Sequence, residues 1–244
     1  MIAITTLHNE VRLTLNLINN SWSTSINAID IDSYINKAKD YIVHNYSKIV
    51  ERDSTLETML RELEVPYKDL RLKQESNKDY VLAKLPRDYH RYLSLKVIGE
   101  KECIKDSKPF ICKDQIWNTR YFQRNDVSLN DINWEPSWNW RSGLYNFNEK
   151  GLYFYHNQKY KVDSIELTYI KTIPDVAAVS LVKNNKYVRS DGKTVTKDQG
   201  LLVTNPFLWR KICDIASYYI RKDKDGKYRE QIESVIFNEN TAVS

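Results

Sequence analysis

The sequence predicts an α+β fold: a helical bundle, formed by an N-terminal helix hairpin plus C-terminal helices, with an inserted antiparallel β domain. Three observations predict it: apolar residues at helical spacing near both ends, β-branched and aromatic runs in the middle, and a change of character near Asp79. We expect four parts, an N-terminal helical part over 1–78, a β-rich insertion over 79–200, a bundle helix over 201–227 and a C-terminal arm over 228–244.

Helical patterns dominate the N-terminal part. Residues 9–18 alternate apolar and polar side chains, which favours a short strand over a helical start. A helix is expected over 33–50, where Asp32 or Ser33 can accept hydrogen bonds from the free N–H groups of the first turn. A second helix is expected over 54–64, with a proline just past its end, so that the two helices form a hairpin.

Strand-like patterns fill the middle of the chain. Residues 87–93 read as a short helical turn, and four segments with β-branched and aromatic residues read as strands, at 93–98, 110–117, 151–155 and 161–170. The dipeptide Asp191-Gly192 predicts a hairpin turn, because it tolerates the positive φ that a two-residue turn requires.

Helical patterns return after Thr204. Asn205-Pro206 opens a long helix, with proline at a position where its missing N–H costs nothing. A charged break over 222–227 separates this helix from a last helical piece. We expect the C-terminal arm to dock on a neighbouring subunit or on a portal through its apolar and aromatic residues, Tyr228, Ile232, Ile236 and Phe237.

Composition indicates a globular protein. The chain has 244 residues, of which 41% are hydrophobic, and its net charge of +5 is spread along the chain. Non-specific binding to nucleic acid is therefore permitted but not indicated. The 17 tyrosines and 6 tryptophans suit surfaces that contact other proteins, and they suit a β-rich core equally well.

Cysteines and apolar runs indicate a cytosolic protein. Cys103, Cys112 and Cys213 form no CxxC pair and have no histidine at metal-ligand spacing, so neither a disulfide framework nor a zinc site is expected. The first residues do not form a signal peptide, and no apolar run approaches the ~20 residues that span a bilayer. We therefore expect no membrane partner.

The sequence shows no recognisable catalytic motif. Asp30 and Asp32 form an Asp-x-Asp, but their place before a helix favours capping over a divalent cation. The four histidines lie far apart, and the few glycines form no phosphate-binding loop. We therefore expect a protein that is not an enzyme, with no catalytic residue, no cofactor and no metal.

Trp134, Trp138 and Trp140 are the candidate binding residues in the middle of the chain. Three tryptophans within seven residues, interrupted by Pro136, do not all face one core from a single regular element. One interpretation is a loop that presents them to a protein partner, since Trp, Tyr and Arg dominate binding energy at interfaces. A sugar-stacking platform and a loop that folds back to cap the sheet are the alternatives.

Four segments, taken in order, carry a resemblance across most of the chain: 31–42, 85–93 with its Leu-Pro-Arg-Asp-Tyr, 162–171 and 206–220. Together they resemble the head-to-tail adaptor or neck ring proteins of short-tailed, crAss-like bacteriophages. The resemblance implies a structural protein of the virion neck, made in the bacterial host cytoplasm. It implies a ring of twelve copies that binds the portal and other neck or tail rings around a channel for DNA.

Two further functions stay open. A carbohydrate-binding or carbohydrate-active module would use Trp134, Trp138 and Trp140, although stacking without convergent carboxylates gives binding and not hydrolysis. A DNA-binding accessory protein is suggested only by the net charge of +5.

Overall fold

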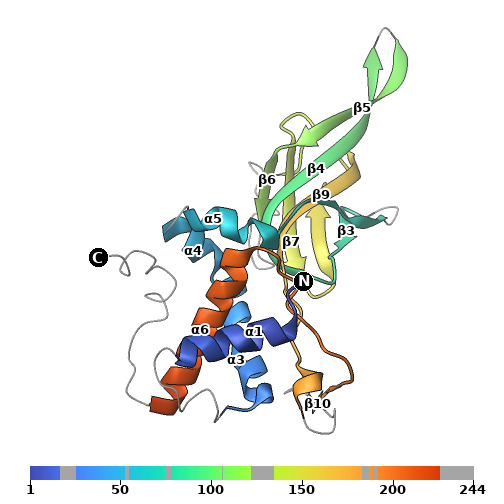
Figure 1. Cartoon of the computed structure of the whole chain (residues 1–244). Coiled ribbons are helices and arrows are strands. Elements are labelled where there is room, and N and C mark those ends of the chain that lie inside the picture. The colour runs from blue at the N-terminus through green and yellow to red at the C-terminus, as the bar shows by residue number, and fades with distance from the viewer. Residues whose placement is uncertain are drawn as a thin grey trace. The chain divides into compact units, whose positions relative to one another are not determined.

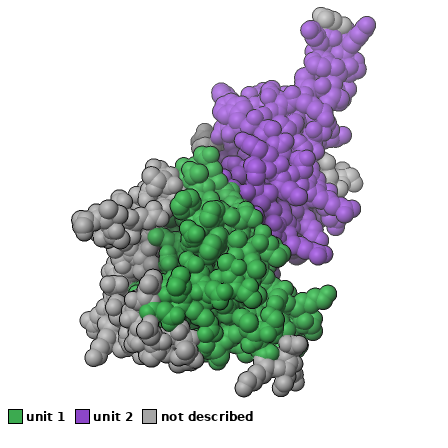
Figure 2. Space-filling model, in the orientation of Figure 1, with its two compact units in different colours: residues 1–63, 172–244 green, residues 64–171 purple. Residues whose placement is uncertain are grey.

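The structure of the protein is a computed structural model, which describes residues 1–16, 26–52, 55–74, 78–105, 107–121, 135–182, 187–188 and 192–225. The chain forms two compact units (Figures 1 and 2). Unit 1 is Met1–Leu63 with Thr172–Ser244, and unit 2 is Glu64–Lys171.

Helices form most of the described part of unit 1. The long ones are α1 (Ile4–Asn16), α3 (Ala28–His44) and α6 (Pro206–Asp225), and α6 packs against both others. Two short helices, α4 (Tyr46–Arg52) and α5 (Thr55–Leu60), lead into the 3-10 turn η1 (Arg61–Leu63). The helices expected over 33–50, 54–64 and from Pro206 are therefore found, although the first is interrupted at Asn45.

Residues 9–16, the described part of the segment expected as a strand, belong to α1 instead. The buried residues Leu7, Val11 and Leu15 of this helix recur every four residues, while Leu13 is exposed. Alternation over so short a stretch fits both periods, and the residues before it decide for the helix, because Ile4 and Leu7 extend the same buried face.

The cap of α3 is Asn27, not Asp32 or Ser33. The Asn27 side chain accepts a hydrogen bond from the backbone N–H of Asp30 at 2.8 Å. Asp32 lies inside the helix and is fully buried, so the Asp-x-Asp neither caps a helix nor presents a pair of exposed carboxylates.

Short irregular elements complete unit 1. The turn η4 (Val179–Leu181) precedes the antiparallel pair of β10 (Tyr187–Val188) and β11 (Thr194–Val195). A hairpin therefore forms at the predicted place, but Val188 pairs with Thr194, so the predicted two-residue turn is not formed. Gly192 has the positive φ that was expected, at 79°. The side chains of Ala177, Val179, Tyr187 and Val195 form a small core of their own.

Unit 2 consists of two sheets. The first is antiparallel and has the order β1 (Glu64–Asp69), β9 (Lys161–Lys171), β4 (Tyr89–Lys105) and β5 (Lys108–Ile116). The second has the order β2 (Arg71–Gln74), β3 (Tyr80–Lys84), β8 (Gly151–Tyr155), β7 (Ser142–Asn148) and β6 (Asn118–Tyr121). Its β6 and β7 run parallel, so the unit is not purely antiparallel.

Side chains from both sheets share one core. Val97 of β4, Ile116 of β5, Phe154 of β8 and Leu167 of β9 are among its buried members. All four predicted strands are present, but residues 89–93 continue β4 and do not form the expected helical turn. Tyr89 and Tyr92 pack against this core, which explains why the extended conformation is preferred there.

The predicted fold class, a helical bundle with an inserted β domain, is wrong. Across the residues that the structure describes, strand residues outnumber helical ones, and the strands form three sheets beside only five α-helices. Capped helices at both ends gave the stronger sequence signal, whereas β1, β2 and β6 are short or largely polar and gave almost none.

The four-part division of the chain stays a prediction, and β1 and β2 are found within its N-terminal part. Its C-terminal arm, 228–244, lies outside the described residues. Of the helices placed by the structure, none has the length and apolar character that crossing a bilayer demands.

Candidate interaction surface

A two-stranded ribbon extends from the first sheet of unit 2. The strands β4 and β5 pair from Val97 and Ile116 out to Lys105 and Lys108, whereas β9 pairs with β4 only as far as Glu100. Beyond Glu100 no other described strand pairs with the ribbon, and in Figure 1 it projects from the rest of the unit. We call residues 101–105 and 107–113 the ribbon tip.

Large apolar side chains on the ribbon tip face solvent. Ile104 is 79% exposed, and Phe110 and Ile111 are exposed as well. Large apolar side chains that project into solvent are typical of a surface that contacts another molecule. The ribbon tip is therefore the first candidate contact surface.

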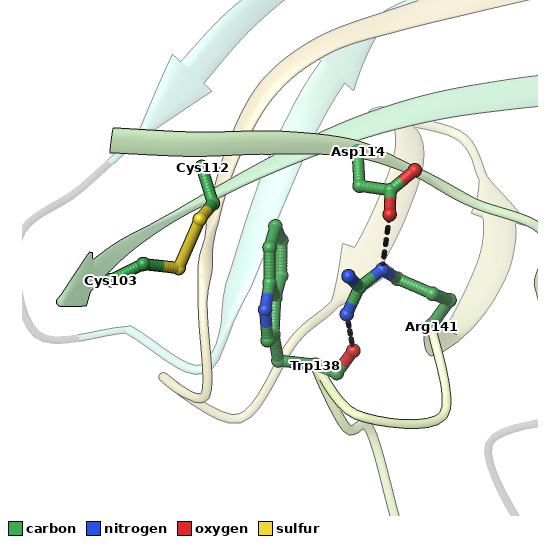
Figure 3. Close-up of a disulfide and its surroundings, with 5 residues drawn as sticks. All are labelled: Cys103, Cys112, Asp114, Trp138 and Arg141. Atoms are coloured by element: carbon green, nitrogen blue, oxygen red, sulfur yellow. Dashed lines mark hydrogen bonds and ion pairs between the residues drawn. A yellow bond between two sulfur atoms is a disulfide. The ribbon is translucent and has the colours of Figure 1, made fainter. Parts of the chain in front are cut away.

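A disulfide between Cys103 and Cys112 joins the two strands of the ribbon tip (Figure 3). The register places Cys103 opposite Phe110 and Cys112 opposite Lys101, so the cysteines are diagonal neighbours with a Cα–Cα distance of 6.0 Å. The expectation that no disulfide forms is wrong, because linear spacing does not show which residues a hairpin brings together.

Trp138 lies beside the disulfide and belongs to the core. It is only 8% exposed, and Cys112 packs against the hydrophobic cluster that contains it. In Figure 3 its indole stands between the disulfide and the guanidinium of Arg141, whose carbon lies 4.1 Å from the ring centroid.

Arg141 connects the tryptophan to β5. Its Nε donates a hydrogen bond to the Asp114 carboxylate at 2.8 Å, and its Nη1 donates to the backbone carbonyl of Trp138. The hydrogen bond from Arg141 is the main cause that lowers the pKa of Asp114. Arg141 itself has a φ of 48°, so the turn that carries it is held in a conformation unusual for a residue with a Cβ.

Trp140 and Trp117 face solvent near the same turn. Trp140 is 75% exposed, and Trp117 precedes Asn118, whose backbone N–H donates to the carbonyl of Arg141 at 3.0 Å. An open cleft of about 610 Å³ lies here, which we call the Trp140 cleft. Its polar lining includes Lys101, Asn118, Glu135, Ser137 and Lys159.

The structure separates the predicted site residues. Trp138 fits the interpretation of a loop that folds back onto the sheet, whereas Trp140 fits a loop that presents an aromatic side chain. Both line the Trp140 cleft. The other candidates, Trp134, Tyr228, Ile232, Ile236 and Phe237, lie outside the described residues.

Sequence reasoning missed the ribbon tip. A signal was present, because Cys103-Ile104 and Phe110-Ile111-Cys112 flank the polar Lys105-Asp106-Ser107-Lys108 almost symmetrically. Such symmetry around a polar turn is typical of a hairpin whose flanking residues face one another.

Unit 1 contains a buried histidine–aspartate pair beside a second cavity. His8 Nε2 lies 2.8 Å from Asp32 Oδ1, and His8 lines a pocket of about 490 Å³ with Arg12 and Leu181 among its other residues. His8 forms no hydrogen bond to a serine, threonine or cysteine of the described chain, and its Nδ1 has no protein partner there. The contacts of the pair are those of a structural link between helices.

Among the described residues, no three His, Cys, Asp or Glu side chains lie close enough together to hold a metal ion. Comparison with known proteins adds no assignment: no family model matches the chain, and no curated protein matches it. The contact surfaces of unit 2 therefore carry the functional argument.

Proposed function

We propose that the chain is a structural head-to-tail adaptor of a tailed bacteriophage, which forms a ring of twelve copies between portal and tail. The order of motifs along the sequence suggests this class. The observation that carries the proposal is the ribbon tip, which holds three large apolar side chains in solvent on a disulfide-linked hairpin.

A ring requires each subunit to contact its two neighbours through different surfaces. The ribbon tip and the Trp140 cleft adjoin at Lys101 and differ in chemistry, since the first is apolar and flanked by lysines, and the second is aromatic and lined by amide, hydroxyl and charged groups. Exposed Trp140 is of a residue type, with Tyr and Arg, from which interfaces draw most of their energy. The modest net charge of +5 suits a channel through which DNA passes without being retained.

Native mass spectrometry and electron microscopy test the proposal directly. The full chain, alone or mixed with a portal protein, is expected to form a closed ring. Phe110→Asp in the ribbon tip should weaken this assembly without changing the melting temperature, because Phe110 lies outside the core. Leu13→Asp, at an exposed apolar position of α1, is the matched control and should assemble normally. A full chain that stays monomeric with every neck protein would contradict the proposal.

Carbohydrate binding is the second candidate function, and the Trp140 cleft is the observation that favours it. An exposed indole beside amide and hydroxyl groups is a suitable surface for a sugar ring. Trp138 contributes little to such a platform, since Arg141 covers one face of its ring. Binding on a glycan array that Trp140→Ala abolishes would favour this function over the ring.

A further inference from the structure

We propose that the Cys103–Cys112 disulfide is a redox-sensitive staple, so that contacts made through the ribbon tip strengthen when the disulfide forms and weaken when it is reduced. The staple itself is a property of unit 2. Only its effect on assembly rests on the proposed function.

The disulfide lies where it can limit the opening of the two strands of the ribbon tip. The strand β9 pairs with β4 up to Glu100, and past that point the ladder of the described residues runs between β4 and β5 alone and ends at Lys105 and Lys108. A two-stranded hairpin without a third strand or a covering helix is marginally stable in water. A covalent link between its strands removes many of the open conformations, and reduction restores them.

The residues that would make contacts lie inside the loop that the disulfide closes. Ile104, Phe110 and Ile111 all fall between Cys103 and Cys112. Ordering a mobile hairpin on binding costs conformational entropy, whereas a stapled hairpin is ordered beforehand. Affinity through the ribbon tip therefore depends on the state of the two sulfur atoms.

External thiols have access to this disulfide. Cys103 and Cys112 are both partly exposed, whereas Cys213 of unit 1 is fully buried and burial raises the pKa of its thiol. The chain has no other cysteine, so exchange depends on a thiol from solution.

Glutathione is the chemical class of reductant and, in its disulfide form, of oxidant. A glutathione thiolate attacks one sulfur, the sulfur–sulfur bond breaks, and the other cysteine leaves as a thiolate that takes up a proton. A second glutathione thiolate then attacks the mixed disulfide and releases the first cysteine. Two electrons pass to the cysteine pair, and two glutathione molecules become one glutathione disulfide. The reverse exchange closes the staple.

Reduction of the disulfide also affects the packing around the Trp140 cleft. Trp138 lies beside the disulfide and lines this cleft, and its carbonyl and ring both contact Arg141. Loosening of the hairpin therefore removes one side of the packing that holds the aromatic turn.

Limited proteolysis tests the staple on the full-length chain. The protein is equilibrated with glutathione or with glutathione disulfide, free thiols are alkylated, and cleavage by chymotrypsin at Phe110 is followed by mass spectrometry. We expect cleavage to be roughly tenfold faster or more in the reduced protein, because cleavage requires the hairpin to open. A Cys103→Ser/Cys112→Ser double variant should cleave at the fast rate under both conditions. Cys213→Ala is the control and should keep the redox response.

Equal cleavage rates in the two glutathione buffers would overturn the proposal, as would alkylation of Cys103 and Cys112 after treatment with glutathione disulfide. Assembly is measured on the same samples. A ring that forms equally well in both redox states overturns the link between staple and contact surface. If neither state assembles with any neck protein, the proposed function fails, while the cleavage rates still decide whether the staple exists.

Discussion

One carboxylate, that of Asp32, connects three segments of unit 1. Its Oδ1 lies 2.8 Å from Nε2 of His8 on α1, and its Oδ2 accepts a hydrogen bond from the backbone N–H of Ala178 at 2.7 Å. Asp32 is fully buried and His8 almost so. The side chain thus fixes α3 to α1 and to the segment before η4 in a place where water cannot replace either bond.

Asp32→Ala should be strongly destabilising, because it leaves the imidazole of His8 and the N–H of Ala178 buried without an acceptor. We expect a loss of about 3–5 kcal/mol in the free energy of unfolding, measured by urea denaturation. Asp30→Ala changes an exposed carboxylate two residues away and should stay within ~0.5 kcal/mol. Similar stabilities of the two variants would show that the pair is not a structural link.

Glu62 is expected to stabilise the start of α6. Its carboxylate accepts from the backbone N–H groups of Thr204 and Asn205 at 2.7 and 2.9 Å, at the positive end of the helix. Glu62→Ala should cost about 1–2 kcal/mol, and Asn205→Ala, which removes the cap of Leu208, about 1 kcal/mol. Thermal denaturation measures both, and Glu57→Ala serves as the control. Unchanged stability of Glu62→Ala would contradict this role.

Gly143→Ala should strain the core of unit 2. A Cβ at this position would lie 2.2 Å from Cζ of Phe154 and 2.8 Å from the hydroxyl of Tyr160. We expect a loss of about 1–3 kcal/mol, measured by urea denaturation. Gly192→Ala offers a comparison, since open space surrounds it and only its φ of 79° opposes the change, at a cost of about 1 kcal/mol. Full stability of Gly143→Ala would mean that β7 and β8 shift easily.

Trp138→Ala should lower the stability of the subunit, whereas Trp140→Ala should weaken assembly and leave stability unchanged. Loss of the buried Trp138 is expected to destabilise unit 2 by about 3–5 kcal/mol, whereas loss of Trp140 should leave stability within ~0.5 kcal/mol. Assembly, followed by native mass spectrometry, should weaken in Trp140→Ala although the subunit is folded. The reverse order of stabilities would contradict the burial of the two indoles.

Asp214→Asn should stabilise the protein at neutral pH. Burial raises the pKa of this carboxyl above its ordinary 3.8, an effect that nearby Lys211 opposes. The unfolded chain then releases this proton at a lower pH than the folded one, so stability falls as the pH rises from 3.8 through the folded-state pKa. The variant should therefore exceed the natural protein in stability at neutral pH and match it near pH 3. An Asp214→Asn variant that is less stable than the natural protein at neutral pH would refute the argument.

Helices with clear apolar periodicity were predictable from the sequence, whereas the cap of α3 and the order of the sheets were not. The apolar face of α6 and the proline at its start sufficed for that helix. The strands β1, β2 and β6 depend on partners far along the chain, as when Glu64 pairs with Ile170, and local propensity carries no trace of such pairing. The overall fold class was therefore misjudged.

The candidate site, like the fold, was predictable from the sequence only in part. Composition left open whether the aromatic residues line a core or a contact surface, and the structure has examples of both in Trp138 and Trp140. The separate environments of Trp138 and Trp140 could not be inferred, because they depend on how the disulfide, Asp114 and Arg141 converge from different segments. The contact of Glu62 with the start of α6 could not be predicted either, since 142 residues separate Glu62 from Thr204.

Unit 1 consists of two stretches of sequence that are separated by unit 2, so its two parts are synthesised at different times. The helices α1 and α3 leave the ribosome first, while α6, against which both pack, begins only at Pro206. At ~5–20 residues per second, their apolar faces wait roughly ten seconds or more for that helix. Nascent chains that end within unit 2 should therefore bind chaperones through α1 and α3, and should be released once α6 has emerged.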